Sequence, residues 1–254
     1  MKESLQPGDP QFVDLQTIYN RGTTGEFGWN LFKYDAVIPP ETWTAAEDIL
    51  KSGKGILVVA NHPTLADGPL LISLLFRNPY FRERKFSVPV AHHQSGVSNL
   101  INDITGSDME LINIVTPDTV KKHPEMASQQ GKGLISYVNS AIDTLGKGGI
   151  VVLFPHAERR PRVGIPQNSD VATELLTRKA EHNNIDYGIL PLGISVPGVS
   201  PELVNGLNLG RKYLIKSGEV ITGKALRDRC KSDKTTADHI IYSVFSQLVP
   251  PEYR

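Results

Sequence analysis

Cysteine is nearly absent from this sequence of 254 residues, which contains a single one, Cys230. One cysteine excludes an internal disulfide framework and any metal site that needs several thiolates. Such scarcity also suits a reducing compartment. Cys230 lies between charged residues in the stretch RDRCKSD, with no base nearby in the sequence, so we interpret it as an ordinary thiol.

Long apolar runs are absent too. A helix that spans a membrane needs on the order of 20 mainly apolar residues, whereas the longest runs here are ILVVA, PLLISLLF and IVVLFP. The first residues, MKESLQPGDPQFVDL, lack the apolar core of a secretory signal. We therefore expect a cytoplasmic protein that is soluble or, at most, rests on a membrane surface.

The chain also lacks net charge, because 27 basic side chains balance 27 acidic ones. No overall field draws it toward nucleic acid or an anionic bilayer, so we expect no nucleic-acid partner and only local attraction. His92 and His93 have no third ligand at a recognisable spacing. The sequence therefore predicts no metal site and no bound cofactor.

The hydrophobic content, 39%, is ample for a large buried core. We expect one domain over residues 1–254, with an N-terminal extension over 1–34 and a C-terminal helix within 226–254. No internal repeat or low-complexity tract divides the chain.

Three short apolar runs, at residues 55–61, 149–155 and 187–195, predict strands buried on both faces. Each run is rich in Val, Ile and Leu, is flanked by Gly or Pro, and lacks polar alternation. A helical pattern precedes each run. Helix then strand, three times over, predicts an α/β fold with a central, mainly parallel sheet covered by helices on both sides.

Helical periodicity marks four stretches. One places four apolar residues on a single stripe before Gly146, which we expect to cap that helix. Another begins at Ser169, a residue type that caps helix N-termini. The four stretches are residues 41–51, 134–146, 169–184 and 236–248, and the stripe comprises Ile135, Val138, Ile142 and Leu145.

Two other stretches are harder to assign. Residues 213–220, YLIKSGEV, predict a small hairpin with Ser217 and Gly218 at its turn. Residues 86–130 are polar and mixed, and they predict no particular element.

The stretch VVANHPTLADGPLL, residues 58–71, ends an apolar run in Asn61 and His62 and places Asp67 five positions after the histidine. Function in open α/β sheets gathers at the carboxyl ends of strands. If the strand ends at Asn61, Pro63 interrupts the regular structure and a helix starts near Thr64. The turn can then bring the side chains of His62 and Asp67 together.

Two interpretations of this pair remain open. In the first, Asp67 only caps the helix start through its spacing from Thr64, and His62 is an ordinary loop residue. In the second, neutral His62 takes a proton from an attacking hydroxyl, while Asp67 fixes the tautomer and stabilises the imidazolium. The second requires no covalent intermediate, because the hydroxyl belongs to the substrate.

The stretch NHPTLAD resembles the N-H-x4-D signature of the glycerolipid acyltransferase family, which includes the 1-acylglycerol-3-phosphate acyltransferases. The later stretches LFPHAERR and ILPLGI, each at a predicted strand, resemble further blocks of that family in order and approximate spacing. The resemblance implies transfer of a fatty acyl group from acyl-CoA or acyl carrier protein to a hydroxyl. It makes His62 the general base and Asp67 its partner.

The family's second block reads approximately F-P-E-G-T-R and holds the polar head of the acceptor. Phe154, Pro155 and Arg159 match it, whereas His156 and the two residues after it, Ala157 and Glu158, do not. The resemblance therefore implies a changed acceptor pocket, in which Asn61 and residues 154–159 bind substrate and the oxyanion. Arg159 suits a phosphate or carboxylate. One alternative is a solvated basic loop, which continues through Arg160 and Arg162. For His156, the alternatives to a substrate contact are a second acid/base group and a neutral replacement in the changed pocket.

A candidate membrane contact follows the motif. The run PLLISLLF, residues 69–76, precedes the basic residues Arg77, Arg82, Arg84 and Lys85, as in an interfacial element. The alternative is a core helix with a solvated end.

Three hypotheses for function follow from these patterns. The first is an O-acyltransferase that uses a glycerophospholipid precursor or a similar small amphiphile as acceptor. The second is a protein that binds acyl thioesters or acyl carrier protein without turnover. The third is an enzyme with an amine or secondary-metabolite acceptor.

Overall fold

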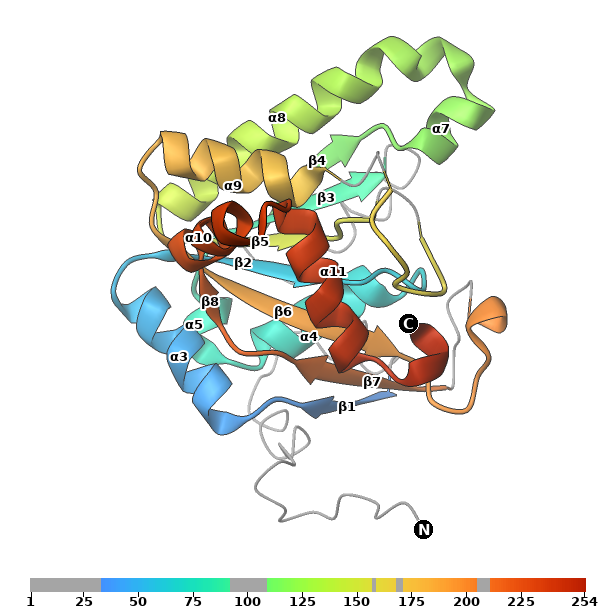
Figure 1. Cartoon of the computed structure of the whole chain (residues 1–254), viewed down its shortest axis with the longest axis horizontal. Coiled ribbons are helices and arrows are strands. Elements are labelled where there is room, and N and C mark those ends of the chain that lie inside the picture. The colour runs from blue at the N-terminus through green and yellow to red at the C-terminus, as the bar shows by residue number, and fades with distance from the viewer. Residues whose placement is uncertain (1–32, 92–108, 157–158, 168–170, 205–210) are drawn as a thin grey trace.

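The computed structural model describes residues 33–91, 109–156, 159–167, 171–204 and 211–254. These residues form an eight-stranded sheet with the order β1-β7-β6-β2-β5-β3-β4, and β8 pairs with β6 (Figure 1). The strands are β1 (Lys33–Val37), β2 (Gly55–Ala60), β3 (Phe86–Ala91), β4 (Met109–Ile114), β5 (Ile150–Leu153), β6 (Tyr187–Ser195), β7 (Lys212–Ser217) and β8 (Ile221–Thr222).

The sheet is mainly parallel. Strand β2 pairs in parallel with both β5 and β6, and β3 joins β5 to β4 in the same direction. Strand β7 runs antiparallel to β6 and carries β1 in parallel at the edge. Every residue of β2, β5 and β6 is buried. The three apolar runs are therefore central strands, and the predicted α/β class is confirmed.

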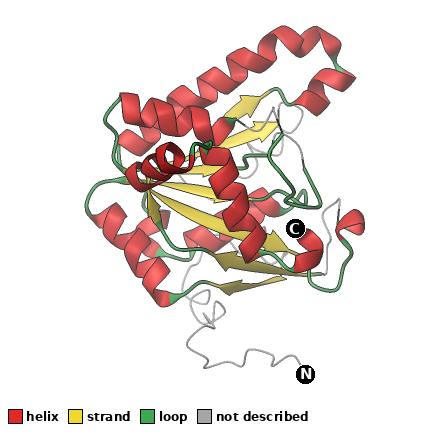
Figure 2. Ribbon diagram, viewed as in Figure 1, coloured by secondary structure: helices red, strands yellow, loops and turns green. Residues whose placement is uncertain are grey.

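Helices cover both faces of this sheet (Figures 1 and 2). In Figure 1, α11 crosses in front of the strands while α4 lies behind them. Helices α8 to α11 pack on one another on the front face, and α3 to α5 do so on the other. The helices are α3 (Pro40–Lys51), α4 (Asp67–Phe76), α5 (Pro79–Arg82), α7 (Pro117–Lys122), α8 (Ala127–Gly146), α9 (Ala172–His182), α10 (Gly223–Asp233) and α11 (Ala237–Leu248), with short 3-10 turns η2 (Pro124–Met126), η3 (Pro201–Leu203) and η4 (Pro251–Tyr253).

Helix α4 contains the run PLLISLLF that we considered as a membrane contact. Its Leu70, Leu71, Leu74 and Leu75 are fully buried, so the run is a core helix and the interfacial interpretation is wrong. Across the described part of the chain, every helix is too short or too polar to cross a bilayer.

Helix α8 differs from its prediction at both ends. It begins seven residues earlier than predicted, at Ala127. Ile135, predicted on the buried stripe, is 62% exposed. Gly146 is the last residue of the helix, and the left-handed residue beyond its end is Gly148, with φ 74°. Glycine adopts positive φ without strain. A glycine therefore does end the helix, but it is Gly148, two positions after the predicted Gly146.

Helix α9 begins at Ala172, and its predicted capping residue Ser169 lies outside the described residues.

The predicted hairpin over 213–220 is wrong. Residues Lys212–Ser217 form one strand, β7, whose partners are β1 and β6. Its alternating burial reflects packing within the sheet rather than a turn. Strand β1 begins at Lys33, inside the range 1–34 predicted as an N-terminal extension.

At the other end of the chain, the helix predicted over 236–248 is confirmed as α11. The wider predicted range 226–254 contains two helices, because it includes most of α10 as well as α11. The stretch 86–130, for which the sequence predicted no particular helix or strand, contains β3, β4 and α7.

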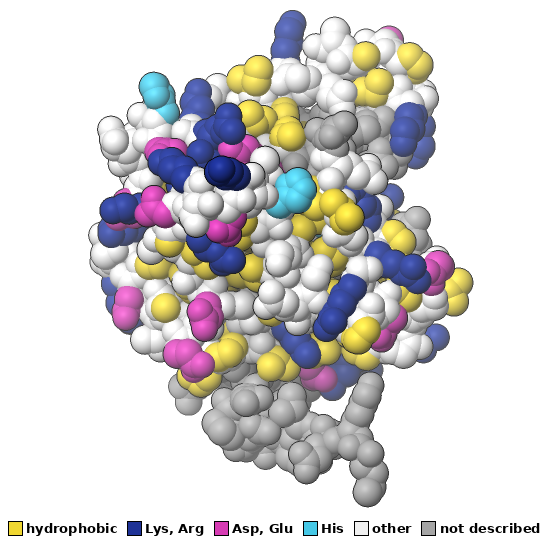
Figure 3. Space-filling view, in the orientation of Figure 1, with side chains coloured by type: hydrophobic (Ala, Val, Ile, Leu, Met, Phe, Trp, Pro, Cys, Tyr) yellow, Lys and Arg dark blue, Asp and Glu magenta, His cyan; other side chains and the backbone are white. Residues whose placement is uncertain are grey.

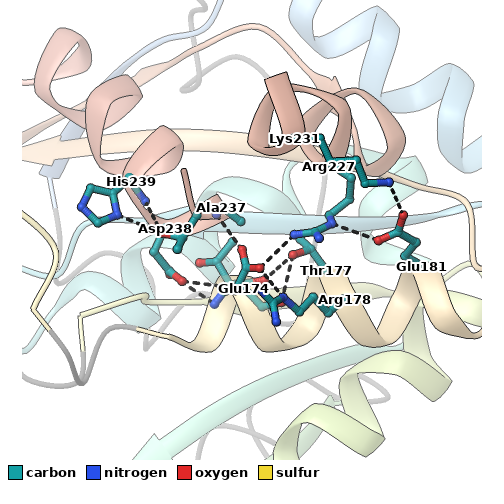
Figure 4. Close-up of polar contacts among 11 residues, drawn as sticks. Glu174, Thr177, Arg178, Glu181, Arg227, Lys231, Ala237, Asp238 and His239 are labelled. Carbon is teal, nitrogen blue, oxygen red and sulfur yellow. Dashed lines mark hydrogen bonds and ion pairs between the residues drawn. The ribbon is translucent and has the colours of Figure 1, made fainter. Parts of the chain in front are cut away.

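Acidic and basic side chains mix on the face shown in Figure 3, over α9 and α10. Beneath them, a carboxylate at the N-terminus of each of the helices α9 and α11 accepts hydrogen bonds from backbone amides at the N-terminus of the other helix (Figure 4). Asp238 of α11 accepts hydrogen bonds from the amides of Thr173 (3.2 Å) and Glu174 (3.0 Å) of α9. Glu174 in turn accepts from the amide of Ala237, 2.7 Å away. Each helix start thus receives a negative charge and acceptors for its free amides.

The pKa values of these two carboxyl groups are shifted in opposite directions. Burial raises the pKa of Asp238 to about 6. Burial acts in the same sense on Glu174, but hydrogen bonds from the Ala237 amide and from Arg178 and Arg227 lower its pKa below the ordinary value. Glu174 therefore stays charged at mildly acidic pH while Asp238 takes up a proton.

Asp238 is expected to make the protein more stable as the pH falls from 8 to 5. Its pKa is about 6 in the folded state against 3.8 as the ordinary value, so the folded carboxyl binds a proton more readily and stability rises as the pH falls. A shift of two pKa units corresponds to about 3 kcal/mol in the free energy of unfolding. About 1–2 kcal/mol of this gain arises between pH 8 and pH 5. Urea unfolding of wild type and Asp238→Asn at both pH values measures this share. An equal pH response in the two proteins would contradict it.

Candidate active site

Strand β2 ends at Ala60, and the chain then turns through Asn61, His62 and Pro63 before α4 begins at Asp67. Proline cannot donate a backbone hydrogen bond, so it suits the end of a strand ladder. The turn brings Nδ1 of His62 to 2.9 Å from Oδ2 of Asp67. The two side chains singled out by sequence spacing are in direct contact.

Asp67 is fully buried and accepts two further hydrogen bonds from Thr64. The Thr64 amide lies 2.8 Å from Oδ2, and the Thr64 hydroxyl lies 2.6 Å from Oδ1. The carboxylate is also in the first turn of α4, where the helix dipole favours negative charge. Asp67 therefore organises the helix start and also contacts the histidine, so the geometry fits either interpretation of the pair.

This contact determines which nitrogen of His62 can act as a base. A carboxylate only accepts hydrogen bonds, so Nδ1 is the nitrogen that carries the proton, and Nε2 of the neutral ring has a free lone pair. The side chain of His62 is 23% exposed. Its ring stacks on Phe154, with 4.4 Å between centroids and 26° between planes. Solvent or a substrate can therefore reach a ring whose orientation is fixed on two sides.

The loop after β5 is attached to the same turn. The amide of Arg160 donates to the carbonyl oxygen of His62 at 3.0 Å. Because β5 lies beside β2, the residues after both strands meet at one edge of the sheet. The two blocks that the sequence analysis linked by resemblance are thus neighbours in space.

Asn61 has a structural position. Its amide nitrogen donates to the carbonyl of Ile194 at 2.9 Å, and its amide oxygen accepts from the Ile194 N–H at 2.6 Å. The side chain is buried and extends the pairing of β2 with β6 by one residue. This geometry does not support the prediction that the Asn61 side chain binds substrate.

Asn61→Ala is expected to lower the free energy of unfolding by about 2–4 kcal/mol, because it leaves the buried N–H and C=O of Ile194 without partners. Urea denaturation measures the change. Asn139→Ala, at an exposed position of α8, serves as the matched control and should stay within about 0.5 kcal/mol of wild type. Unchanged stability with lost substrate binding would instead restore the predicted binding role.

His156 packs into the interior. The residue is only 3% exposed, its Nε2 lies 3.3 Å from the Val163 carbonyl, and its ring centroid lies 4.6 Å from that of Tyr242 on α11. A carbonyl accepts, so Nε2 is the protonated nitrogen. Contact between His156 and a substrate would require this ring to be uncovered.

The other residues of the second block lie closer to the histidine or to solvent. Phe154 forms the stack with His62, and Pro155 is buried. Arg159 is partly buried, and its Nε has no hydrogen-bond partner among the described residues. Arg162 pairs with Glu202 at 2.5 Å on the surface.

Ala157 and Glu158 lie outside the described residues, as do His92 and His93.

Sequence reasoning missed some residues that shape the site. Thr64 was noted only as a capping position, whereas it donates twice to Asp67. Tyr242 gave no signal, because an aromatic residue on a helical stripe is usually core. No group of three or more His, Cys, Asp or Glu side chains within the described ranges is arranged to hold a metal ion.

No family model matches the chain, and no curated protein is significantly similar to it. Among solved structures, the chain is similar to the 1-acyl-sn-glycerophosphate acyltransferase PlsC from Thermotoga maritima. The identity is 16%, the match covers 92% of this chain and 79% of that one, and the TM-score is 0.47. We therefore infer the reaction from the residues of the site.

Proposed function

We propose that this protein transfers an acyl group from an acyl thioester to a hydroxyl of a small amphiphilic acceptor. The observation that carries the proposal is the 2.9 Å contact between Nδ1 of His62 and the buried Asp67 at the carboxyl end of a central strand. It leaves Nε2 of the partly exposed ring free to accept a proton. The resemblance of NHPTLAD to the acyltransferase signature supports the same reaction.

In this mechanism, Nε2 of His62 removes the proton from the acceptor hydroxyl while the oxygen attacks the thioester carbonyl. Asp67 stabilises the imidazolium that forms and keeps the ring in place. The tetrahedral intermediate collapses by breaking the carbon–sulfur bond, and the leaving thiolate takes the proton from the imidazolium. The products are an ester and a free thiol, and the protein returns to its starting protonation state.

Arg159 is the side chain best suited to bind an anionic group of a substrate. It carries a fixed positive charge, and its Nε lacks a partner among the described residues. A guanidinium binds phosphate or carboxylate through two parallel hydrogen bonds. We assign it to a phosphate or carboxylate of the acceptor or donor, while Phe154 and Pro155 shape the approach to His62.

The donor in this proposal is acyl-CoA or acyl carrier protein, and the acceptor is a glycerophospholipid precursor or a similar small molecule. The test incubates the protein with both donor types and a panel of hydroxyl and amine acceptors. Free thiol and the mass of the acylated product are measured. Product that forms only with hydroxyl acceptors supports the proposal.

Two outcomes would replace the proposal. Acylation of amines alone would move the reaction to an amine acceptor. Acyl thioester that stays bound and intact over a long incubation would make the protein a binder without turnover.

A further inference from the structure

The turn between β2 and α4 (Figure 1) contains a threonine that makes more hydrogen bonds to Asp67 than His62 does. Thr64 is fully buried. Its amide donates to Oδ2 of Asp67 at 2.8 Å, and its hydroxyl lies 2.6 Å from Oδ1. A carboxylate only accepts hydrogen bonds, so the hydroxyl is the donor. Thr64 therefore directs both its N–H and its O–H at the residue that contacts the histidine ring.

The hydroxyl of Thr64 is itself held in one orientation. Its oxygen accepts a hydrogen bond from the amide of Ala66 at 3.0 Å, so its proton stays directed at Asp67. Thr64, Ala66 and Asp67 are all fully buried. Water therefore does not stand ready to replace a donor that a substitution removes, and a buried charge that loses its partner is strongly disfavoured.

The two oxygens of Asp67 have different partners. Oδ2 receives Nδ1 of His62 at 2.9 Å together with the Thr64 amide, whereas Oδ1 receives the Thr64 hydroxyl. Among the described residues, His62 is the one charged or titratable side chain that contacts Asp67. The Cβ–Cγ torsion of aspartate has only a broad preference of its own. Contacts on both oxygens are therefore what keep Oδ2 directed at the ring.

We propose that Thr64 is a positioning residue, which holds the carboxylate of Asp67 so that Oδ2 meets Nδ1 of His62 and Nε2 is left to act as the base. Thr64 is buried and acts through Asp67 rather than on the reacting atoms. The inference rests on the proposed acyl transfer and extends it, because the N-H-x4-D signature leaves this position open.

Thr64→Ala and Thr64→Ser separate the hydroxyl from the rest of the side chain, because both lack the methyl group and only serine keeps the hydroxyl. Thr64→Ala is expected to lower kcat by about 10- to 10²-fold, the usual effect of a misplaced catalytic group. Its KM should stay within about twofold of wild type, since ground-state binding is not changed. Thr64→Ser should retain most of the wild-type kcat. Thiol release at varied donor and acceptor concentrations gives both constants.

The matched control is Thr177→Ala in α9. Thr177 is also a buried threonine, and its hydroxyl lies 2.9 Å from the Thr173 carbonyl and 3.1 Å from that of Glu174. This variant should lose stability, as Thr64→Ala does, but should turn over as fast as wild type. Urea unfolding shows whether each variant is folded. If Thr64→Ala does not fold, Thr64→Val, which keeps the volume of the side chain, is measured in its place with the same expectation.

A second readout needs no substrate. The proton on Nδ1 of His62 lies in a hydrogen bond to a buried carboxylate, and such charge-assisted bonds are strong. It should give a ¹H NMR resonance downfield of the backbone amides, assigned by its loss in His62→Gln. We expect this resonance to move upfield or to be lost to exchange with water in Thr64→Ala, and to persist in Thr64→Ser and Thr177→Ala.

Either an unchanged kcat or an unchanged resonance in Thr64→Ala would overturn the proposal, as would an equal loss in Thr64→Ser or Thr177→Ala. A higher KM at normal kcat would overturn it too, by placing Thr64 in substrate binding. If wild type transfers no acyl group between any donor and acceptor, the proposed function fails, whereas the resonance still decides whether Thr64 holds the contact between Asp67 and His62.

Discussion

Replacing His62 with glutamine is expected to lower kcat/KM for acyl transfer by about 10²- to 10⁴-fold, the usual contribution of a positioned general base. Glutamine is similar in size and can still donate to Asp67, but it cannot take up the proton of the acceptor. Free-thiol release with the best donor and acceptor from the substrate panel measures the effect. Affinity for the acyl thioester should change little, because the proposed role of His62 is in the reaction step.

The matched control is His182→Gln, which removes an exposed histidine at the end of α9. Its activity should equal that of wild type. Urea unfolding of His62→Gln should show a nearly unchanged midpoint, since the ring is partly exposed and its stack with Phe154 is a modest contact. If His62→Gln turned over as fast as wild type, His62 would not be the base.

Replacing Asp67 with asparagine is expected to affect both reaction and stability. An amide can offer its N–H to Nδ1 of His62, which favours the tautomer with the proton on Nε2 and removes the base; the expected loss in kcat is about 10²- to 10⁴-fold. Asparagine also has one acceptor oxygen where the carboxylate receives Thr64 and His62 on two. A buried group left without its partner costs about 1–3 kcal/mol.

Steady-state kinetics and urea unfolding of the same preparation separate these two effects. Asp48→Asn is the control, because Asp48 is exposed and its contact with Lys51 is a surface ion pair of 3.4 Å. The double variant His62→Gln/Asp67→Asn should lose scarcely more activity than His62→Gln alone, since residues that act as a unit are not additive. Normal kcat combined with lower stability in Asp67→Asn would leave Asp67 with the capping role only.

The central part of the fold was predictable because burial on both faces leaves a direct mark in the sequence. Strands β2, β5 and β6 are continuous apolar runs, and their positions agree with the prediction to within two residues at each end. Strand β7 was misassigned because its alternation of buried and exposed residues also fits a hairpin. Its partner β1 begins at Lys33, far from it in sequence, and pairing at that distance leaves no local pattern.

The candidate site divides in the same way. The contact of His62 with Asp67 is local, so the spacing and the proline indicated that the two side chains could meet, and the family resemblance favoured their pairing. The partners of Asn61 and His156 are Ile194 and Tyr242, on elements much later in the chain. Residue type and position in a motif say nothing about such partners, so the prediction that both side chains contact substrate could not take these partners into account.

Asp67 has two roles in the structure: it accepts the Thr64 amide at the start of α4, and it contacts the ring of His62. In a relative without the proposed reaction, the acid would still be needed at the helix start, whereas the imidazole would keep only its contact with Asp67 and its stack on Phe154. Under the proposed function, the residue at position 62 is therefore a better marker of activity among relatives than the residue at position 67.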